Sequence, residues 1–218
     1  MDYRNTGRVA AGLAAMLLAA AAGGCDTLGY LGYLMAPEAK KVKVPPEYEG
    51  LTKRKVAVVI YADQQVQYEY PYARLGLSAA LNSELKKHLE GAAIVDPRRV
   101  IRYQDDNVHW DTMDKTTLGQ AFEADAVLYV ILEQYSMREP GSISLFRGQI
   151  SAQARVYDVS LPESQALVWQ GDDFAVIYPE HAPVGELGED DSKVRFETEK
   201  QLAAAIVGRF YEREVPVE

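Results

Sequence analysis

Residues 126–135 read AVLYVILEQY, and this run is the clearest fold signal in the chain. It is almost wholly apolar and rich in Val, Ile and Leu, as expected for a β-strand that is buried on both faces. A second run of the same kind, KVAVVIY, occupies residues 55–61. Two such strands, well separated in the sequence, predict a sheet that is flanked by helices.

Helical periodicity appears in three segments. Residues 73–90 carry leucines four positions apart with charged side chains on the opposite face, and Gly91 is expected to end this helix. Residues 115–122 predict a short helix whose N-cap is Asp114. Residues 192–211 predict a closing helix with an apolar stripe of i, i+4 spacing.

The remaining strands are weaker. Residues 93–95 and 100–103 are expected to be small edge strands, whereas 148–160 alternate between apolar and polar side chains, as in a half-buried antiparallel strand. Residues 166–178 predict the strand that follows it. The order predicts an α/β (α+β) fold: a single mixed β-sheet flanked by helices, with a late antiparallel meander and a C-terminal helix.

Composition excludes several classes of protein. The 218 residues are 48% hydrophobic and 25% charged, which is the balance of a globular protein and excludes a largely disordered chain or a coiled-coil rod. A formal charge of −9 argues against a nucleic-acid partner, because binding to phosphates needs clustered Lys and Arg. One cysteine excludes an intrachain disulfide framework and a multi-cysteine metal site.

The first 24 residues have the pattern of a secretory signal. Arg4 and Arg8 precede an uncharged run rich in Ala and Leu, and small residues follow it. The sole cysteine, Cys25, comes next, in the sequence Ala-Gly-Gly-Cys. Two alternatives remain open: an uncleaved membrane helix, for which the run is short, and an ordinary secretory signal followed by a chance cysteine.

This N-terminal segment resembles a bacterial lipoprotein signal, whose motif is Leu-Ala-Gly-Cys or a near variant. The resemblance implies cleavage before Cys25, a diacylglyceryl thioether on its sulfur and an acylated new N-terminus, with palmitate among the acyl chains. We therefore expect four parts: a signal peptide at 1–24, a lipidated tether at 25–52, a domain at 53–213 and a tail at 214–218. Within the tether, the apolar segment TLGYLGYLMA is expected to lie in the lipid interface, dock onto the domain or form a flexible lead.

The predicted domain resembles a known group of envelope proteins. The evidence is the first strand, the segment EADAVL at 123–128 and the hairpin that ends in ALVWQG at 166–171. These features are similar to the periplasmic α/β domain of the curli secretion lipoprotein (CsgG-like), of the lipoprotein activators of penicillin-binding proteins and of the TolB N-terminal domain. The positions that match the recurring motifs are Asp125, Tyr157, Asp158 and Trp169.

No catalytic or metal-binding pattern stands out. The sequence has no G-x-S-x-G elbow, no P-loop and no G-x-G-x-x-G. The acidic loop at 104–114 lacks the glycine and the spacing of an EF-hand, and His88, His109 and His181 lack metal-ligand spacing. We therefore expect no enzyme activity, no catalytic residues, no metal and no cofactor.

Tyrosine is abundant, with 14 Tyr against 5 Phe. Tyr68, Tyr70 and Tyr72 form a cluster after the first strand. Tyrosine is enriched at binding surfaces because it buries a large area and keeps a polar tip. The three residues are therefore candidates for partner binding; alternatively, they line an amphipathic edge of the fold.

The combined expectation is a non-catalytic, membrane-anchored lipoprotein of the cell envelope. It would face the periplasm from the inner or the outer membrane, held by the lipid on Cys25, and bind another envelope component in assembly, secretion or wall maintenance. Two alternatives are a membrane-displayed hydrolase or carbohydrate-processing enzyme and a structural subunit of a self-assembled secretion complex. The sequence leaves the partner unnamed.

Overall fold

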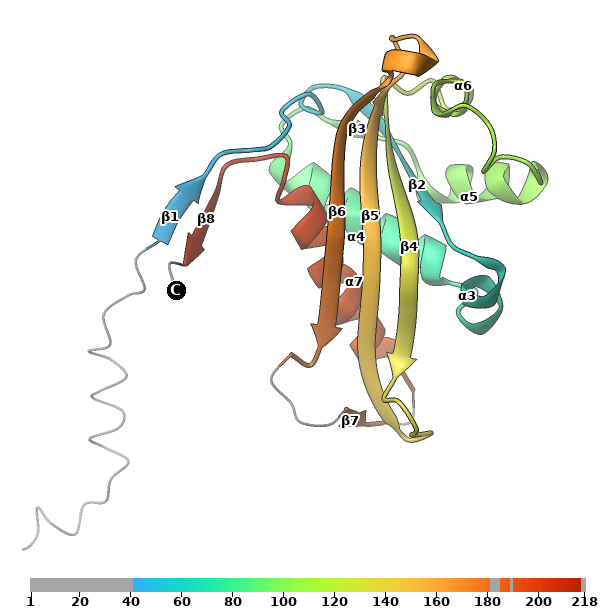
Figure 1. Ribbon diagram of the computed structural model, residues 1–218, viewed down its shortest axis with the longest axis vertical. Coiled ribbons are helices and arrows are strands. Elements are labelled where there is room, and N and C mark those ends of the chain that lie inside the picture. The colour runs from blue at the N-terminus through green and yellow to red at the C-terminus, as the bar shows by residue number, and fades with distance from the viewer. Residues whose placement is uncertain (1–40, 181–184, 189, 217–218) are drawn as a thin grey trace, which may run out of the picture. The chain divides into compact units, whose positions relative to one another are not determined.

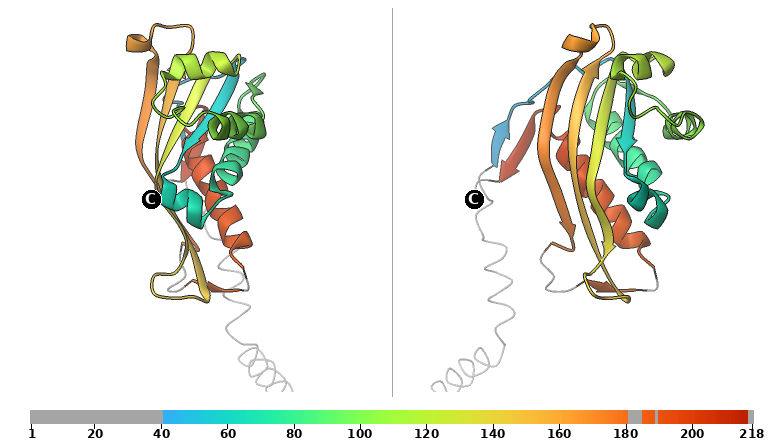
Figure 2. Two further views of the ribbon diagram at one scale, coloured as in Figure 1. Left: turned by 90° about the vertical axis from the view of Figure 1, so that its right-hand side faces the viewer. Right: turned by 45° about the vertical axis from the view of Figure 1, so that its right-hand side comes forward.

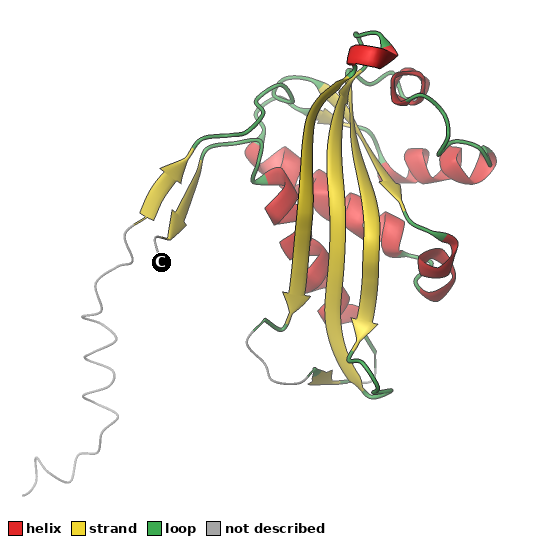
Figure 3. Cartoon of the chain, in the orientation of Figure 1, coloured by secondary structure: helices red, strands yellow, loops and turns green. Residues whose placement is uncertain are grey.

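The computed structural model describes residues 41–180, 185–188 and 190–216 (Figure 1). The signal segment and the predicted lipidation residue Cys25 lie outside these ranges. By its contacts the chain divides into one unit of Met1–Val42 with Val215–Glu218 and a second unit of Lys43–Glu214. The second unit contains the main sheet and all the helices described below (Figure 3).

The main sheet has the order β3-β2-β4-β5-β6. Its strands are β2 (Lys55–Tyr61), β3 (Ala93–Ile94), β4 (Ala126–Arg138), β5 (Leu145–Asp158) and β6 (Leu167–Tyr178). Strand β2 is parallel to β3 and β4, whereas β4, β5 and β6 form an antiparallel meander, and the short β7 (Glu186–Leu187) pairs with the start of β5. The mixed sheet with a late meander is therefore confirmed.

Helices cover both faces of β2 and of the first part of β4, which explains why these segments are almost wholly apolar. On one face, α4 (Ala73–His88) and α7 (Ser192–Val207) pack side by side over the sheet (Figure 2). On the other face, α5 (Pro97–Asp106) and α6 (Lys115–Ala121) cover a smaller apolar cluster around Val59. The central parallel strands are thereby removed from water on both sides.

The meander is covered on one face only. Along β5, Ile150, Ala152 and Ala154 are buried towards α7, while the residues between them are only half buried. This alternation is the pattern of an antiparallel strand with one solvated face. The prediction of a half-buried strand in this segment is confirmed.

The edge strand predicted at 100–103 is wrong, because these residues lie in α5. The Asp96 side chain accepts a hydrogen bond from the backbone N–H of Arg98 (2.8 Å), and Pro97 occupies the first turn. Both features are helix-start signals. Val100 and Gln104 are then buried four positions apart, which is helical spacing.

Regular structure also occurs in the segment expected to be a linker. Strand β1 (Lys41–Val44) pairs with β8 (Arg213–Pro216) in a separate two-stranded sheet. Leu51 is fully buried in the main core. The described end of the predicted tether, 41–52, therefore contains a strand and a core residue, and the described part of the predicted tail, 214–216, lies in a strand.

Candidate interaction surface

The three candidate tyrosines lie around α3 (Gln64–Glu69) and the start of α4, and they have different environments. Tyr68 and Tyr72 are 88% and 67% exposed, respectively. Tyr70 is partly buried: its ring centroid lies 5.1 Å from that of Tyr135, and its hydroxyl accepts a hydrogen bond from the backbone N–H of Met137 (3.2 Å). Two of the three are therefore available to a partner, and Tyr70 is tied to β4.

Local sequence explains why the two tyrosines stay exposed. The side chain of Asp63 caps α3 by accepting a hydrogen bond from the backbone N–H of Val66 (2.7 Å). No residue of α3 is fully buried, because this helix follows the end of β2 and lies outside the core. Tyr72 occupies the N-cap position of α4, before the first turn that packs against the sheet.

A third exposed aromatic residue belongs to the same end of the domain. Helices α4 and α7 run in the same direction: Gly76 faces Glu199, and the ring of His88 stacks on that of Tyr211 with the centroids 4.0 Å apart. Tyr72 and Phe196, which is 62% exposed, each lie about one turn before the first of these contacts. We call Tyr68, Tyr72 and Phe196 the aromatic end.

A hollow of about 340 Å³ opens beside this end. Its lining comes from four elements, which are α3, β4, α7 and the turn before α7, and consists of Glu69, Tyr70, Arg138, Asp191 and Arg195. Arg195 forms an ion pair with Asp191 (3.5 Å), and Arg138 donates to the carbonyl of Ile143 (2.8 Å). Both arginines are thus held by intramolecular contacts, and the hollow presents charges of both signs.

Below this end lies a buried carboxyl that sequence analysis missed. Glu199 is 5% exposed and accepts a hydrogen bond from the hydroxyl of Tyr135 (2.6 Å). A Cβ atom added at Gly76 would lie 2.5 Å from the Glu199 Oε2 atom, so glycine makes room for the carboxyl. Burial raises the pKa of Glu199 to about 7, an effect that Asp191 increases and that Tyr135 and Arg195 oppose.

Two residues of the acidic loop and one histidine have structural partners. Asp105 forms an ion pair with Arg74 (2.7 Å), and the Asp114 side chain caps α6, as predicted, by accepting from the backbone N–H of Thr116 (3.1 Å). His88 stacks on Tyr211, and His181 lies outside the described residues. Within the described part of the chain, no group of three or more His, Cys, Asp or Glu side chains is placed to hold a metal ion.

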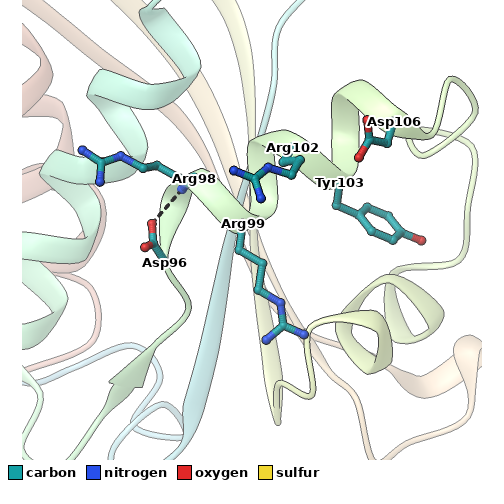
Figure 4. Close-up of a pocket in the computed structure, with 6 residues that line it drawn as sticks. All are labelled: Asp96, Arg98, Arg99, Arg102, Tyr103 and Asp106. Carbon is teal, nitrogen blue, oxygen red and sulfur yellow. Dashed lines mark hydrogen bonds between the residues drawn. The ribbon is translucent and has the colours of Figure 1, made fainter.

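A second hollow, of about 420 Å³, lies along α5 and contains three arginines (Figure 4). Arg99 is held by the carbonyl of Ala121 (3.2 Å) and by Glu123 (3.3 Å). Figure 4 shows the side chains of Arg98, Arg99 and Arg102 pointing in different directions. Because the guanidinium groups do not converge, this hollow lacks the geometry of an anion site.

The motif residues that suggested envelope lipoproteins are structural in this fold. Asp158, at the end of β5, forms an ion pair with Arg54 (2.7 Å), and hydrogen bonding to Arg54 holds the pKa of Asp158 well below its usual range. Asp125 accepts the backbone N–H of Lys55 (2.7 Å), and its carbonyl accepts a hydrogen bond from Arg54 (2.5 Å). These contacts join the starts of β2 and β4 to the end of β5.

The described residues include no helix that is long and apolar enough to cross a membrane. The sequence matches no family model and no curated protein. Among solved structures, the chain is similar to the PelC dodecamer from Paraburkholderia phytofirmans (TM-score 0.44, 12% identity, covering 80% of this chain and 99% of that one). It is also similar to lipoprotein GNA1162 from Neisseria meningitidis (TM-score 0.43, 19% identity, covering 71% of this chain and 96% of that one). At these values the similarities carry no conclusion about the function of this chain.

Proposed function

We propose that the chain is a non-catalytic lipoprotein of the cell envelope, anchored by lipid on Cys25, whose domain binds another envelope protein through the aromatic end. The support for the anchor is the signal-like segment that ends in the sole cysteine. The sequence resemblance to periplasmic lipoprotein domains is consistent with this location. Inner or outer membrane remains open.

The observation that carries the binding proposal is the exposure of three aromatic side chains at one end of the domain. Tyr68, Tyr72 and Phe196 are 88%, 67% and 62% exposed. Aromatic residues are enriched at the centre of protein interfaces, and polar and charged residues form the surrounding rim. The neighbouring hollow supplies both Arg and Asp side chains at its rim.

The test is crosslinking in native membranes, followed by purification of the tagged full-length protein and mass spectrometry. We expect one dominant envelope protein, and we expect its recovery to fall at least about tenfold in the Tyr68→Ala/Tyr72→Ala variant, as for loss of an aromatic hot spot. Both side chains are exposed, so the free energy of unfolding is expected to change by less than about 0.5 kcal/mol.

A matched control distinguishes this surface from exposed apolar residues in general. Val42→Ala/Leu167→Ala removes two side chains, one on β1 and one at the start of β6, that are 53% and 46% exposed, and it is expected to keep the partner. Equal loss in both double variants would refute the assignment of the surface. Recovery of the protein alone would refute a hetero-partner and favour self-assembly.

A further inference from the structure

The sheet ends at β6, and this strand has a free edge among the described residues. An edge strand exposes unpaired backbone N–H and C=O groups, which form a template for pairing with another chain. At 12 residues, β6 is long for an edge strand. The parts of its edge that are protected, and the part that is not, indicate where another chain could pair.

The first part of β6 is tied to distant parts of the chain through side chains on its buried face. The indole N–H of Trp169 donates to Glu47 (3.2 Å), and Arg209 pairs with the same carboxylate (2.6 Å). The guanidinium carbon of Arg209 lies 5.6 Å from the ring centroid of Phe174. The segment around Glu47 and Arg209 therefore flanks β6 up to Phe174.

A bulge then divides the strand. Ala152 of β5 pairs with Phe174 and Ala154 pairs with Gly171, so Asp172 and Asp173 both oppose a single residue. Asp173 has a φ of 63°, in the left-handed region, so the backbone departs from extended geometry at the bulge. Both aspartates are exposed, and charge combined with a bulge prevents strand addition at this point.

The last part of β6 lacks these protections. Residues 174–178 read FAVIY, without charge or proline. A hollow of about 400 Å³ lies beside them, lined by Ala175, Val176, Ile177, Glu180 and Gln201 of α7. At about 3.4 Å per residue, this stretch offers about 17 Å of edge, enough for a short extended peptide.

We propose that the 174–178 edge of β6 binds an extended segment of a partner protein by strand addition, with basic residues at the ends of that segment. Pairing between the backbones provides the affinity. Alternate side chains of the bound partner segment face either the hollow or the solvated face of the sheet, which carries Ile177. Asp172 and Asp173 lie at one end of the edge and Glu180 at the other, and the described residues that line the hollow include no Lys or Arg. These charges favour Lys or Arg on both flanks of the bound partner segment.

The probe is the fluorescent peptide Lys-Val-Thr-Val-Thr-Val-Lys with blocked termini, titrated into the full-length protein in detergent and followed by anisotropy. We expect saturable binding that weakens as salt rises. A peptide with proline in place of both threonines is expected not to bind, because it lacks two donors and resists pairing. A peptide with Glu flanks is expected to bind at least about tenfold more weakly.

Two variants of the same strand provide the matched comparison. Ile177→Lys places a cation on the proposed edge, after the bulge. Leu167→Lys places the same cation on the same strand before the bulge, and the two native side chains are almost equally exposed, at 45% and 46%. We expect affinity to fall at least about tenfold in Ile177→Lys and to change less than about twofold in Leu167→Lys. Hydrogen exchange is expected to slow at residues 174–178 when the peptide is added.

Several outcomes would overturn this inference: no peptide binding, equal binding of the proline peptide, equal effects of the two variants, or protection at the aromatic end instead. A dimer that Ile177→Lys converts to a monomer, without peptide binding, would assign the edge to a second copy. None of these results removes the capture expected through Tyr68 and Tyr72, so this inference and the proposed function fail separately.

Discussion

Replacement of Glu199 by glutamine is expected to abolish a pH dependence of stability that this residue alone creates. In the folded protein its pKa is about 7, against an ordinary value of 4.5 that applies when the chain unfolds. The folded state therefore binds more protons than the unfolded state between these two values. The stabilisation is complete below about pH 4.5 and is lost as pH rises through 7.

The magnitude follows from the shift. Each pKa unit corresponds to about 1.4 kcal/mol, so the difference of about 2.5 units predicts a loss of about 3 kcal/mol between pH 4.5 and pH 8. The residue is 5% exposed, so solvent screening does not reduce this figure substantially. Glu199→Gln keeps the shape and can still accept the Tyr135 hydrogen bond, but it carries no charge at any pH.

The assay is urea unfolding of the full-length protein in detergent at a series of pH values. The difference in unfolding free energy between Glu199→Gln and wild type is expected to grow by about 3 kcal/mol from pH 4.5 to pH 8, in favour of the variant. Glu197→Gln is the control, because Glu197 lies on the same helix and pairs with Lys200 near the surface. Parallel pH profiles for wild type and Glu199→Gln would refute the reasoning.

Three further substitutions test other contacts by urea midpoints. Asp158→Asn breaks the ion pair with Arg54 and is expected to lower the free energy of unfolding by about 2 kcal/mol at pH values above 3.8, the ordinary pKa of the carboxyl group. The loss is expected to become smaller as the pH falls, and a loss that is the same at every pH would contradict the ion pair. Gly148→Ala places a Cβ against the side chain of Thr198 and is expected to cost about 1–3 kcal/mol; an unchanged midpoint would show that α7 shifts freely. Tyr70→Ala is expected to cost about 2 kcal/mol, so an effect below about 0.5 kcal/mol would show that its contacts with β4 are dispensable.

Most of the sheet could be predicted because its strands depend on local patterns. The runs KVAVVIY and AVLYVILEQY are almost wholly apolar, and helices cover both faces of β2 and of the first part of β4. Residues 100–103, VIRY, also have strand-like composition, but the Asp96 cap and Pro97 start a helix before them. The helix-start signal outweighs a four-residue apolar pattern because it fixes the backbone at the first turn.

The candidate surface was predicted in part. The abundance of tyrosine pointed to Tyr68 and Tyr72, but only the fold distinguishes them from Tyr70, whose neighbour Tyr135 is distant in sequence. The burial of Glu199 could have been predicted from helical spacing. Glu199 lies three and seven residues before Leu202 and Ile206, on the same face of the helix as these core residues. The space that accepts its carboxyl comes from Gly76 and required the structure.

The position of β2 has a consequence for how the chain is made. This strand pairs with β4, which follows four helices later, and α4 packs over it in the main core. Pairing between such distant segments makes folding slow. A chain that emerges N-terminus first therefore leaves the β4 side of KVAVVIY unpaired until residues 126–131 have been synthesised. Until then this apolar run is open to pairing with other chains, which makes the incomplete chain prone to aggregation.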